Sequence, residues 1–271
     1  MAESEYVLGT DEGELNRLRR QHELWVLEAQ DLWRRAGFRS DDKAMDLGCG
    51  PGFTTLELAR YLGPKSRITA VDASDRFLKY LASRAKAEFP EAKIDVVESF
   101  IEKMDLGTKD FDAAYCRWLM IFVPDVLGAL KAVRRHLKPG ATFALQEYVS
   151  YEAMQVCPEI PVMERVLAAI FKSWKDQGGN PNRGRELPNL LEQAGFRIRE
   201  LRPVARISRP NEPLWDWPTG FFGNYLPKMV AQGYLSAADR AEFETGWKEA
   251  MTKPGSFFLA PMVIDVIADA V

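Results

Sequence analysis

Residues 44–52 read Ala-Met-Asp-Leu-Gly-Cys-Gly-Pro-Gly, and this stretch decides the fold that we predict. Asp46 ends a short apolar run, three glycines follow at alternate positions, and residues 53–59 then have the pattern of a first helix. A strand, a glycine-rich turn and a helix in this order bring a nucleotide-like ligand against bare backbone. Glycine suits the turn because it accepts positive φ and has no Cβ to hold a ligand away.

An acid at a fixed spacing makes this turn more specific. Residues 67–71 read as the next strand, which ends in Asp72, 20 positions after Gly52. An acid at the tip of the second strand can accept hydrogen bonds from both hydroxyls of a ribose. The turn and the acid together predict a ligand site, and the alternative is a tight strand–helix turn without a ligand.

The spacing of the glycines separates two classes of cofactor. A dinucleotide fold uses Gly-x-Gly-x-x-Gly, so that a pyrophosphate lies on the N-terminus of the helix. Here the pattern is Gly-x-Gly-x-Gly, and Asp46 places a negative charge just before it. That charge disfavours a pyrophosphate and suits a ligand with an ammonium group.

Residues 46–52 resemble the first motif of the class I S-adenosylmethionine-dependent methyltransferases, Asp-Leu-Gly-Cys-Gly-x-Gly. Further segments of the chain resemble a bacterial branch of that family that acts on small molecules. These segments are 6–9, 17–21, 115–120, 123–125, 137–140 and 147–148. The resemblance extends over about residues 40–148 and again from 183 to the end. It departs from the family at Ala141, where a second glycine is usual, and at 98–100, where the Asp of the usual adenine contact is missing.

Strand and helix patterns alternate along most of the chain. After an N-terminal helix at 11–36, the expected strands are 43–46, 68–72, 94–97, 111–116, 141–148, 197–208 and 257–266. Such alternation is typical of a parallel sheet with helices on both faces. We therefore expect an α/β fold: a doubly wound, seven-stranded, mostly parallel sheet with helical cap insertions and an N-terminal helix.

The interruptions of this alternation divide the chain. We expect an N-terminal cap helix at 1–38, core segments at 39–148 and 183–208, and a last core strand at 255–271. Between them lie two cap insertions, 149–182 and 209–254, the second of which is rich in proline and aromatic residues.

The carboxyl ends of parallel strands share one edge, and ligands of doubly wound sheets bind there. Around this edge, with the N-terminal helix closing over it, the pattern and the resemblance together predict cofactor contacts from Tyr6, Arg17, Gln21, Asp46, Gly48, Cys49, Gly50, Asp72, Ala73, Ser99, Phe100, Cys116 and Arg117.

Several of these residues have a second interpretation. Asp46 either favours the cofactor's ammonium group or is a turn acid without a ligand. Phe100 either packs on adenine, with Ser99 at its edge, or is a core residue. Arg117 either holds a carboxylate of cofactor or substrate or forms an ion pair with an acid such as Glu147.

Arg17 and Gln21 lie one helical turn apart and so share a face. They either cap the cofactor's carboxylate or belong to a solvated helix face. The substrate pocket is expected from the aromatic residues of the cap and of the strand ends, namely Trp118, Tyr148, Trp217, Phe221 and Tyr225.

Glu147, at the end of the fifth expected strand, is the candidate catalytic base, and a structural acid is its alternative. No acid or histidine cluster has the spacing of metal ligands, so we expect no metal. The resemblance and the turn predict a methyltransferase that moves a methyl group from S-adenosyl-L-methionine to O, N or C of a small molecule, leaving S-adenosyl-L-homocysteine. An NAD-dependent oxidoreductase and a catalytically silent cofactor-binding module are the alternatives.

Composition narrows the partners. The 271 residues are 46% hydrophobic and 28% charged, with a formal net charge of −3 and no basic field, so nucleic acid is not expected. Three cysteines at 49, 116 and 157 fit neither a zinc motif nor a disulfide framework. With no apolar run long enough for a membrane span and no signal segment, we expect a cytoplasmic protein. The oligomeric state is not readable.

Overall fold

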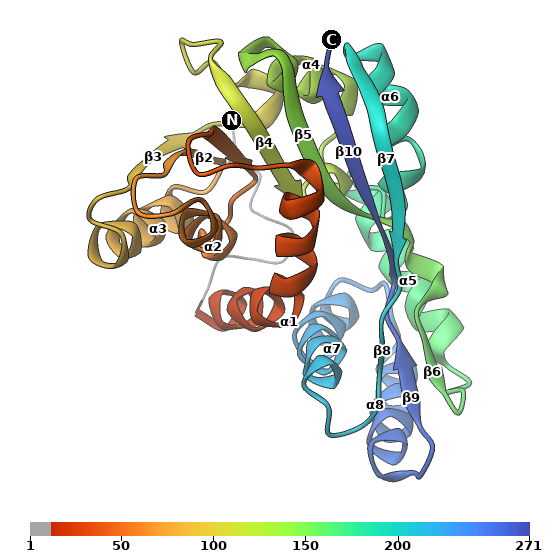
Figure 1. Cartoon of the computed structure of the whole chain (residues 1–271). Coiled ribbons are helices and arrows are strands. Elements are labelled where there is room, and N and C mark those ends of the chain that lie inside the picture. Colours follow the sequence, from red (N-terminus) through yellow and green to blue (C-terminus); the bar gives the residue numbers. More distant parts are fainter. Residues whose placement is uncertain (1–11) are drawn as a thin grey trace.

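A seven-stranded sheet runs through the computed structural model, which describes residues 12–271 (Figure 1). Its order is β3-β2-β1-β4-β5-β10-β7, and only β10 runs antiparallel to its neighbours. The strands are β1 (Lys43–Leu47), β2 (Arg67–Asp72), β3 (Lys93–Glu98), β4 (Phe111–Arg117), β5 (Leu137–Ser150), β7 (Phe196–Val204) and β10 (Met262–Ala270). The predicted seven-stranded, mostly parallel sheet is confirmed.

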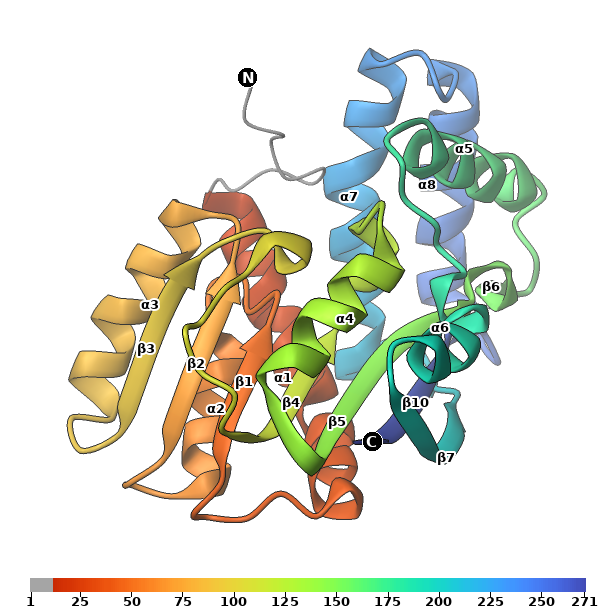
Figure 2. The same ribbon diagram turned by 90° about the horizontal axis from the view of Figure 1, so that it is seen from above.

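Helices cover both faces of this sheet (Figure 2). One face packs against α1 (Glu12–Ala36), α2 (Phe53–Leu62) and α3 (Asp75–Glu88). The other face packs against α4 (Val126–His136) and α6 (Leu187–Gln193). N-cap residues mark the starts of α3 and α4. The side chains of Ser74 and Asp125 accept hydrogen bonds from backbone N–H groups in the first turns of these helices.

A second group of elements extends beyond the carboxyl ends of the central strands. It contains α5 (Met163–Asp176), α7 (Asp216–Ala231), α8 (Ala237–Thr252) and a small sheet with the order β6-β9-β8. The strands of this small sheet are β6 (Gln155–Cys157), β8 (Ile207–Ser208) and β9 (Phe257–Leu259). Its core is one large cluster of buried apolar side chains, many of them aromatic, that also includes Trp25 of α1.

Two predicted strands are wrong in extent. The strand expected at 197–208 is divided into β7 and β8, and the one expected at 257–266 into β9 and β10. The chain leaves the large sheet at both places and pairs again in the small sheet. Pro261 lies at one break and has no N–H for the ladder, while Ala260 N donates to Arg206 O at 2.9 Å across it.

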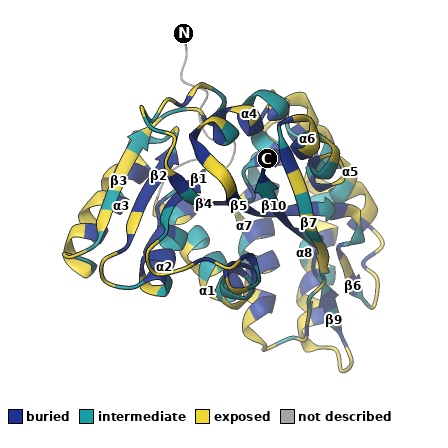
Figure 3. Cartoon of the chain, turned by 45° about the horizontal axis from the view of Figure 1, so that its top comes forward, coloured by how far each residue is buried: buried dark blue, intermediate teal, exposed yellow. Residues whose placement is uncertain are grey.

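Burial follows this arrangement (Figure 3). The central strands β1 and β4 and residues 143–148 of β5 are almost wholly buried, whereas the edge strand β3 is exposed or half-buried along its length. Within residues 12–271, no helix is both long enough and apolar enough to cross a membrane.

Candidate functional site

The glycine-rich turn after β1 has positive φ at Gly48, Gly50 and Gly52, of 66°, 54° and 80°. A Cβ on Gly48 would lie 2.8 Å from the Leu119 side chain, and one on Gly52 would lie 2.2 Å from Leu81. A Cβ on Gly50 would meet no atom within 4 Å. Two glycines are thus required by packing, and the third leaves backbone open to a ligand.

Asp72 ends β2 beside this turn. Its Oδ2 accepts from Gly50 N at 2.8 Å and its Oδ1 from Ser74 N at 2.9 Å. Burial raises the pKa of this carboxyl, and the backbone hydrogen bonds act against that rise. Each carboxylate oxygen has a second lone pair, so the acid can still accept hydrogen bonds from a ligand. Ala73, next along the chain, is exposed.

Asp46 lies beneath the turn and is buried. Its Oδ2 accepts from the Thr55 hydroxyl at 2.6 Å, which ties β1 to the first turn of α2. Burial raises the pKa of Asp46 to about 6. The buried thiols of Cys49 and Cys116, beside it in the turn and at the end of β4, have pKa values raised by burial, which suits packing and not nucleophilic chemistry.

Ser99 and Phe100 follow β3 on the far side of Asp72. Ser99 N donates to Asp72 O at 2.9 Å, which holds the start of this loop against β2. The Phe100 ring is 45% exposed, with Lys103 Nζ 5.3 Å from its centre. Phe100 is therefore no core residue, and its ring is free to pack on a ligand.

Arg117, at the end of β4, forms no ion pair with Glu147, so this alternative was wrong. Arg117 Nη2 donates to Thr54 Oγ1 at 2.9 Å and lies 3.3 Å from His22 Nδ1. Its Nη1 is buried and has no hydrogen-bond partner among residues 12–271. Burial and the charge of Arg117 lower the pKa of His22 to about 3, so His22 is neutral. A buried guanidinium N–H without an acceptor fits an anionic ligand group.

Glu147 is buried in β5 and binds backbone instead. Its Oε1 accepts from Tyr148 N at 2.9 Å and its Oε2 from Ile121 N at 3.3 Å. Burial raises the pKa of Glu147 to about 8. The carboxyl group holds the turn after β4 against β5, and it is not part of the cavity lining described next.

A cavity of about 50 Å³ lies between α1, the ends of β4 and β5, and α7. Below it is called the aromatic cavity. Four of the five predicted pocket residues line it, and Tyr225 does not, because its hydroxyl bonds Ser173 of α5 at 2.8 Å. The complete lining among the described residues is Arg17, Gln21, Trp118, Ile121, Phe122, Tyr148, Tyr151, Met154, Trp174, Trp217, Pro218, Phe221, Phe258 and Pro261.

Three rings of the aromatic cavity lie nearly parallel. Trp118 lies between Tyr148 and Trp217, with centroid distances of 5.4 and 6.1 Å and interplanar angles of 9° and 14°. Trp25 of α1 meets both tryptophans edge-on. Trp118 has φ 53°, which is an outlier for a bulky residue and marks a position that the surrounding structure holds in place.

Arg17 and Gln21 line the same cavity, so the solvated-face alternative was wrong for them. Arg17 forms two hydrogen bonds to the buried Glu14, at 2.6 and 2.7 Å, and donates to Gln21 Oε1 at 2.8 Å. Gln21 Oε1 also accepts from Trp217 Nε1 at 3.0 Å, which links α1 to α7. Tyr6 lies outside the described residues.

Sequence reasoning missed Tyr151, Met154 and Trp174 among the cavity residues. All three lie in the insertion after β5, where the amphipathic helix α5 was predicted but its inner face was not assigned to a site. For Trp174 the sequence did contain a signal, because an aromatic residue on the apolar face of a predicted cap helix can line a pocket.

The fold and the site are those of one class of protein. In this class a doubly wound sheet has a glycine-rich turn open to a ligand after β1, and further elements cover the edge formed by the carboxyl ends of the strands. Comparison with known families agrees, because residues 44–140 match the family described as a methyltransferase domain. Residues 44–140 are thus similar to a methyltransferase domain, as the first motif of the chain predicts.

Individual relatives support the same domain. A 2-phytyl-1,4-naphthoquinone methyltransferase of Trichormus variabilis is 33% identical over 47% of this chain and 55% of its own length. A demethylmenaquinone methyltransferase of Staphylococcus aureus is 28% identical over 65% of this chain and 75% of its own length. This chain spans about half the length of the first relatives it matches.

Solved structures extend the likeness over most of the fold. The structure described as a methyltransferase from Bacillus halodurans superposes with a TM-score of 0.60 at 16% identity. The superposition covers 88% of this chain and 96% of that one. At this identity the likeness concerns the fold alone.

Proposed function

We propose that this protein is an enzyme that transfers a methyl group from S-adenosyl-L-methionine to a small molecule and releases S-adenosyl-L-homocysteine. The observation that carries the proposal is the juxtaposition, at one sheet edge, of an open glycine turn, an acid at the end of β2 and an arginine whose buried Nη1 has no hydrogen-bond partner among residues 12–271. The methyltransferase names of the relatives support it.

The residues present fit this cofactor. Asp72 would accept the ribose hydroxyls, and the open backbone at Gly50 would lie against the methionine part of the cofactor. Arg117 Nη1, buried and unpartnered among residues 12–271, would donate to its carboxylate. Asp46 and Asp72 would place negative charge near its ammonium group. The bound cofactor supplies a methyl group on a positively charged sulfur, which is a good leaving group.

The chain's own task is then positioning and the exclusion of water. Alignment of reacting groups can be worth about 7–11 kcal/mol in favourable cases. Trp118 and Tyr148 form a rigid aromatic wall next to Arg117, where an acceptor molecule would be held away from water. Glu147 supports this wall from behind through the backbone of Ile121 and Tyr148. This arrangement favours its structural role over that of a base.

We further propose that the two insertions and the N-terminal helix act as a cap that opens to admit the acceptor. Three features support a moving cap: the aromatic cavity is small, it is bounded by α1 and α7, and these helices are joined by the Gln21–Trp217 hydrogen bond. Small-molecule pockets usually measure about 300–1,000 Å³. The boundaries 149–182 and 209–254, the cytoplasmic location and the absence of nucleic-acid partners stay predictions.

Calorimetry on the full chain tests the cofactor. S-adenosyl-L-methionine and S-adenosyl-L-homocysteine should bind, and NAD should give no heat. Asp72→Asn keeps the shape of the side chain and removes its charge, so affinity should fall about 10- to 100-fold, the equivalent of about 1.5–3 kcal/mol. Asp75→Asn is the matched control, because Asp75 is an exposed acid that pairs with Lys79 in α3.

Two outcomes of these titrations would contradict the proposal. Tight NAD binding would overturn the proposal in favour of an oxidoreductase, and equal losses in both variants would remove Asp72 from the ribose. Incubation with methyl-labelled cofactor and a panel of small aromatic alcohols, amines and acids then separates an enzyme from a silent binding module.

A further inference from the structure

The aromatic cavity has the shape of a site for a flat molecule. Tyr148, Trp118 and Trp217 present three nearly parallel rings, within 14° of one another for each adjacent pair. Aromatic rings pack best in offset stacks or edge to face, and a flat conjugated ligand continues such a stack. A saturated ring or a flexible chain would make fewer contacts with these faces.

Two hydrogen-bond donors in the cavity lining lack an acceptor. The indole Nε1 atoms of Trp118 and Trp174 are buried and have no hydrogen-bond partner among residues 12–271, although the Tyr225 hydroxyl lies near the Nε1 atom of Trp174. An indole N–H can only donate, and a buried donor without an acceptor costs free energy. Trp33 has such an N–H too, so the missing partner alone marks no site. Trp118 and Trp174 differ because both residues line the cavity.

The charges around the cavity disfavour a cationic ligand. No described lining residue is an acid, and the lining residue that carries charge, Arg17, is paired with Glu14. The guanidinium carbon of Arg117 lies 4.9 Å from the centre of the Trp118 ring. A ligand cation would compete with this arginine for the ring and would find no counter-charge.

We infer that the aromatic cavity binds the methyl acceptor, and that this acceptor is a planar aromatic compound, neutral or anionic, whose oxygen substituents accept hydrogen bonds from Trp118 and Trp174. The inference rests on the proposed methyl transfer and names its substrate class. The cavity of about 50 Å³ holds only a few water molecules, so the ring enters as α1 and α7 separate.

Binding of simple probes tests the inference on protein saturated with S-adenosyl-L-homocysteine, whose own binding is measured first. The probes are 2-naphthol, naphthalene, decahydro-2-naphthol and phenyltrimethylammonium. We expect 2-naphthol to bind at least about 10-fold more tightly than decahydro-2-naphthol and phenyltrimethylammonium. Trp118→Phe and Trp174→Phe keep an aromatic ring and remove the donor, so each should weaken 2-naphthol about 3- to 10-fold.

Two controls isolate the hydrogen bond. Naphthalene has no oxygen to accept a hydrogen bond. Its affinity should therefore change only slightly, and equally, in Trp118→Phe and Trp174→Phe. Trp33→Phe removes an equally buried and unpartnered N–H that packs against Tyr61 and Tyr115, away from the cavity, and should leave 2-naphthol binding unchanged.

The inference is overturned if 2-naphthol does not bind to the cofactor-loaded protein, or if the saturated or cationic probe binds as tightly. It is also overturned if the Trp118 and Trp174 variants match Trp33→Phe. Each of these results leaves the cofactor titration intact, so it does not touch the proposed methyltransferase function. A failed cofactor titration would instead reject that function itself.

Discussion

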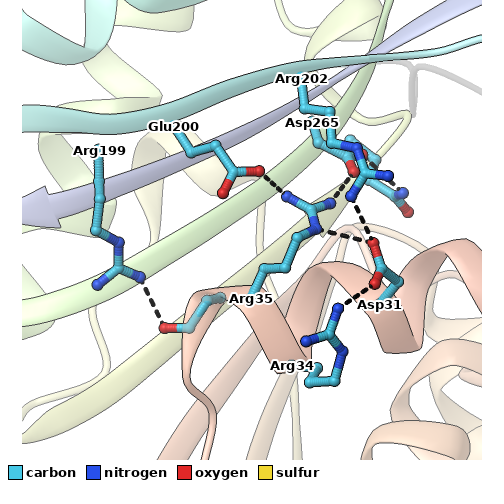
Figure 4. Close-up of polar contacts among 9 residues, drawn as sticks. Asp31, Arg34, Arg35, Arg199, Glu200, Arg202 and Asp265 are labelled. Carbon is cyan, nitrogen blue, oxygen red and sulfur yellow. Dashed lines mark hydrogen bonds and ion pairs between the residues drawn. The ribbon is translucent and has the colours of Figure 1, made fainter.

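Two buried regions hold helix α1, and they do so with different chemistry. Near its C-terminal end, Arg35 forms ion pairs with Asp31, Glu200 and Asp265, which ties the helix to β7 and β10 (Figure 4). Near its N-terminal end, α1 contacts α7 through the neutral hydrogen bond from Trp217 to Gln21 and an exposed ion pair between Arg20 and Asp216, with edge-on packing of Trp25 on the rings of the aromatic cavity.

The two ends of α1 differ in the free energy needed to separate the helix from its neighbours. Asp265 is 2% exposed, so removing Arg35 would leave a charge without a partner in the interior. Separation of α1 from α7 would expose the neutral Gln21–Trp217 pair and break the Arg20–Asp216 ion pair, which is already about half exposed, and water can satisfy all four groups. The buried Arg17–Glu14 pair lies wholly within α1 and moves with it. One end of α1 is therefore an anchor, and the other end can act as part of a cap.

Two buried carboxyls, Asp265 beside Arg35 and Glu147 behind the aromatic cavity, also differ in their partners. Asp265 accepts from Gln146 at 2.9 Å and pairs with Arg35, whereas Glu147 has two backbone N–H groups and no cation in hydrogen-bond contact among the described residues. Burial raises the pKa of both, and for Glu147 to about 8. Asp265 thus has an arginine as its partner, whereas Glu147 is neutral over much of the physiological pH range.

The largest expected effect tests the anchor. Arg35→Met should lower the free energy of unfolding by about 3–5 kcal/mol, because it leaves Asp265 buried and unpaired. Arg34→Met, next along the helix, removes an arginine that is 67% exposed, and should change stability by less than about 0.5 kcal/mol. Urea unfolding of the two variants measures the contrast. Equal losses would show that the cluster around Arg35 is no anchor.

The second prediction concerns how Glu147 makes the free energy of unfolding depend on pH. Its pKa is higher in the folded protein, about 8, than its ordinary value of 4.5, so the folded state holds a proton that the unfolded state has lost. Its contribution to stability is complete below about pH 4.5 and disappears as pH rises toward 8. Glu147→Gln should therefore flatten the fall in unfolding free energy between pH 5.5 and 8. An unchanged slope would remove Glu147 as its source.

The same variant separates structure from catalysis. If Glu147 takes a proton from the acceptor, Glu147→Gln should leave cofactor affinity intact and lower turnover about 10²–10⁴-fold. The structure favours the other result, a change in melting and pH slope with turnover kept within about 10-fold. The carboxyl group faces backbone N–H groups and does not line the aromatic cavity.

The smallest effect concerns the end of α1 that contacts α7. Trp217→Phe keeps a ring and removes the donor to Gln21, so stability should fall by only about 0.5–1.5 kcal/mol. Trp247→Phe is the matched control, because it removes a hydrogen bond to Thr219 within the cap, at 3.1 Å. Both should lose similar stability, but only Trp217→Phe should speed hydrogen exchange in residues 12–25. Identical exchange in the two variants would contradict a hinge at this contact.

Local sequence determined much of the fold and one side of the site. The glycines after β1 and the acid at the end of β2 follow from short-range rules on φ, strand ends and spacing. Alternating patterns likewise predicted the parallel strands and the cap insertions. These features depend on residues close together in the chain, so the sequence contains their physical cause directly.

Only the tertiary structure decided which partners the polar side chains find. Arg117 has Thr54 and His22 beside it and not Glu147, and Gln21 meets Trp217, nearly 200 residues away. The division of the last strands between two sheets also depends on pairing between distant segments. Such contacts are chosen by the packing of whole elements against one another, and no local pattern in the chain specifies that packing.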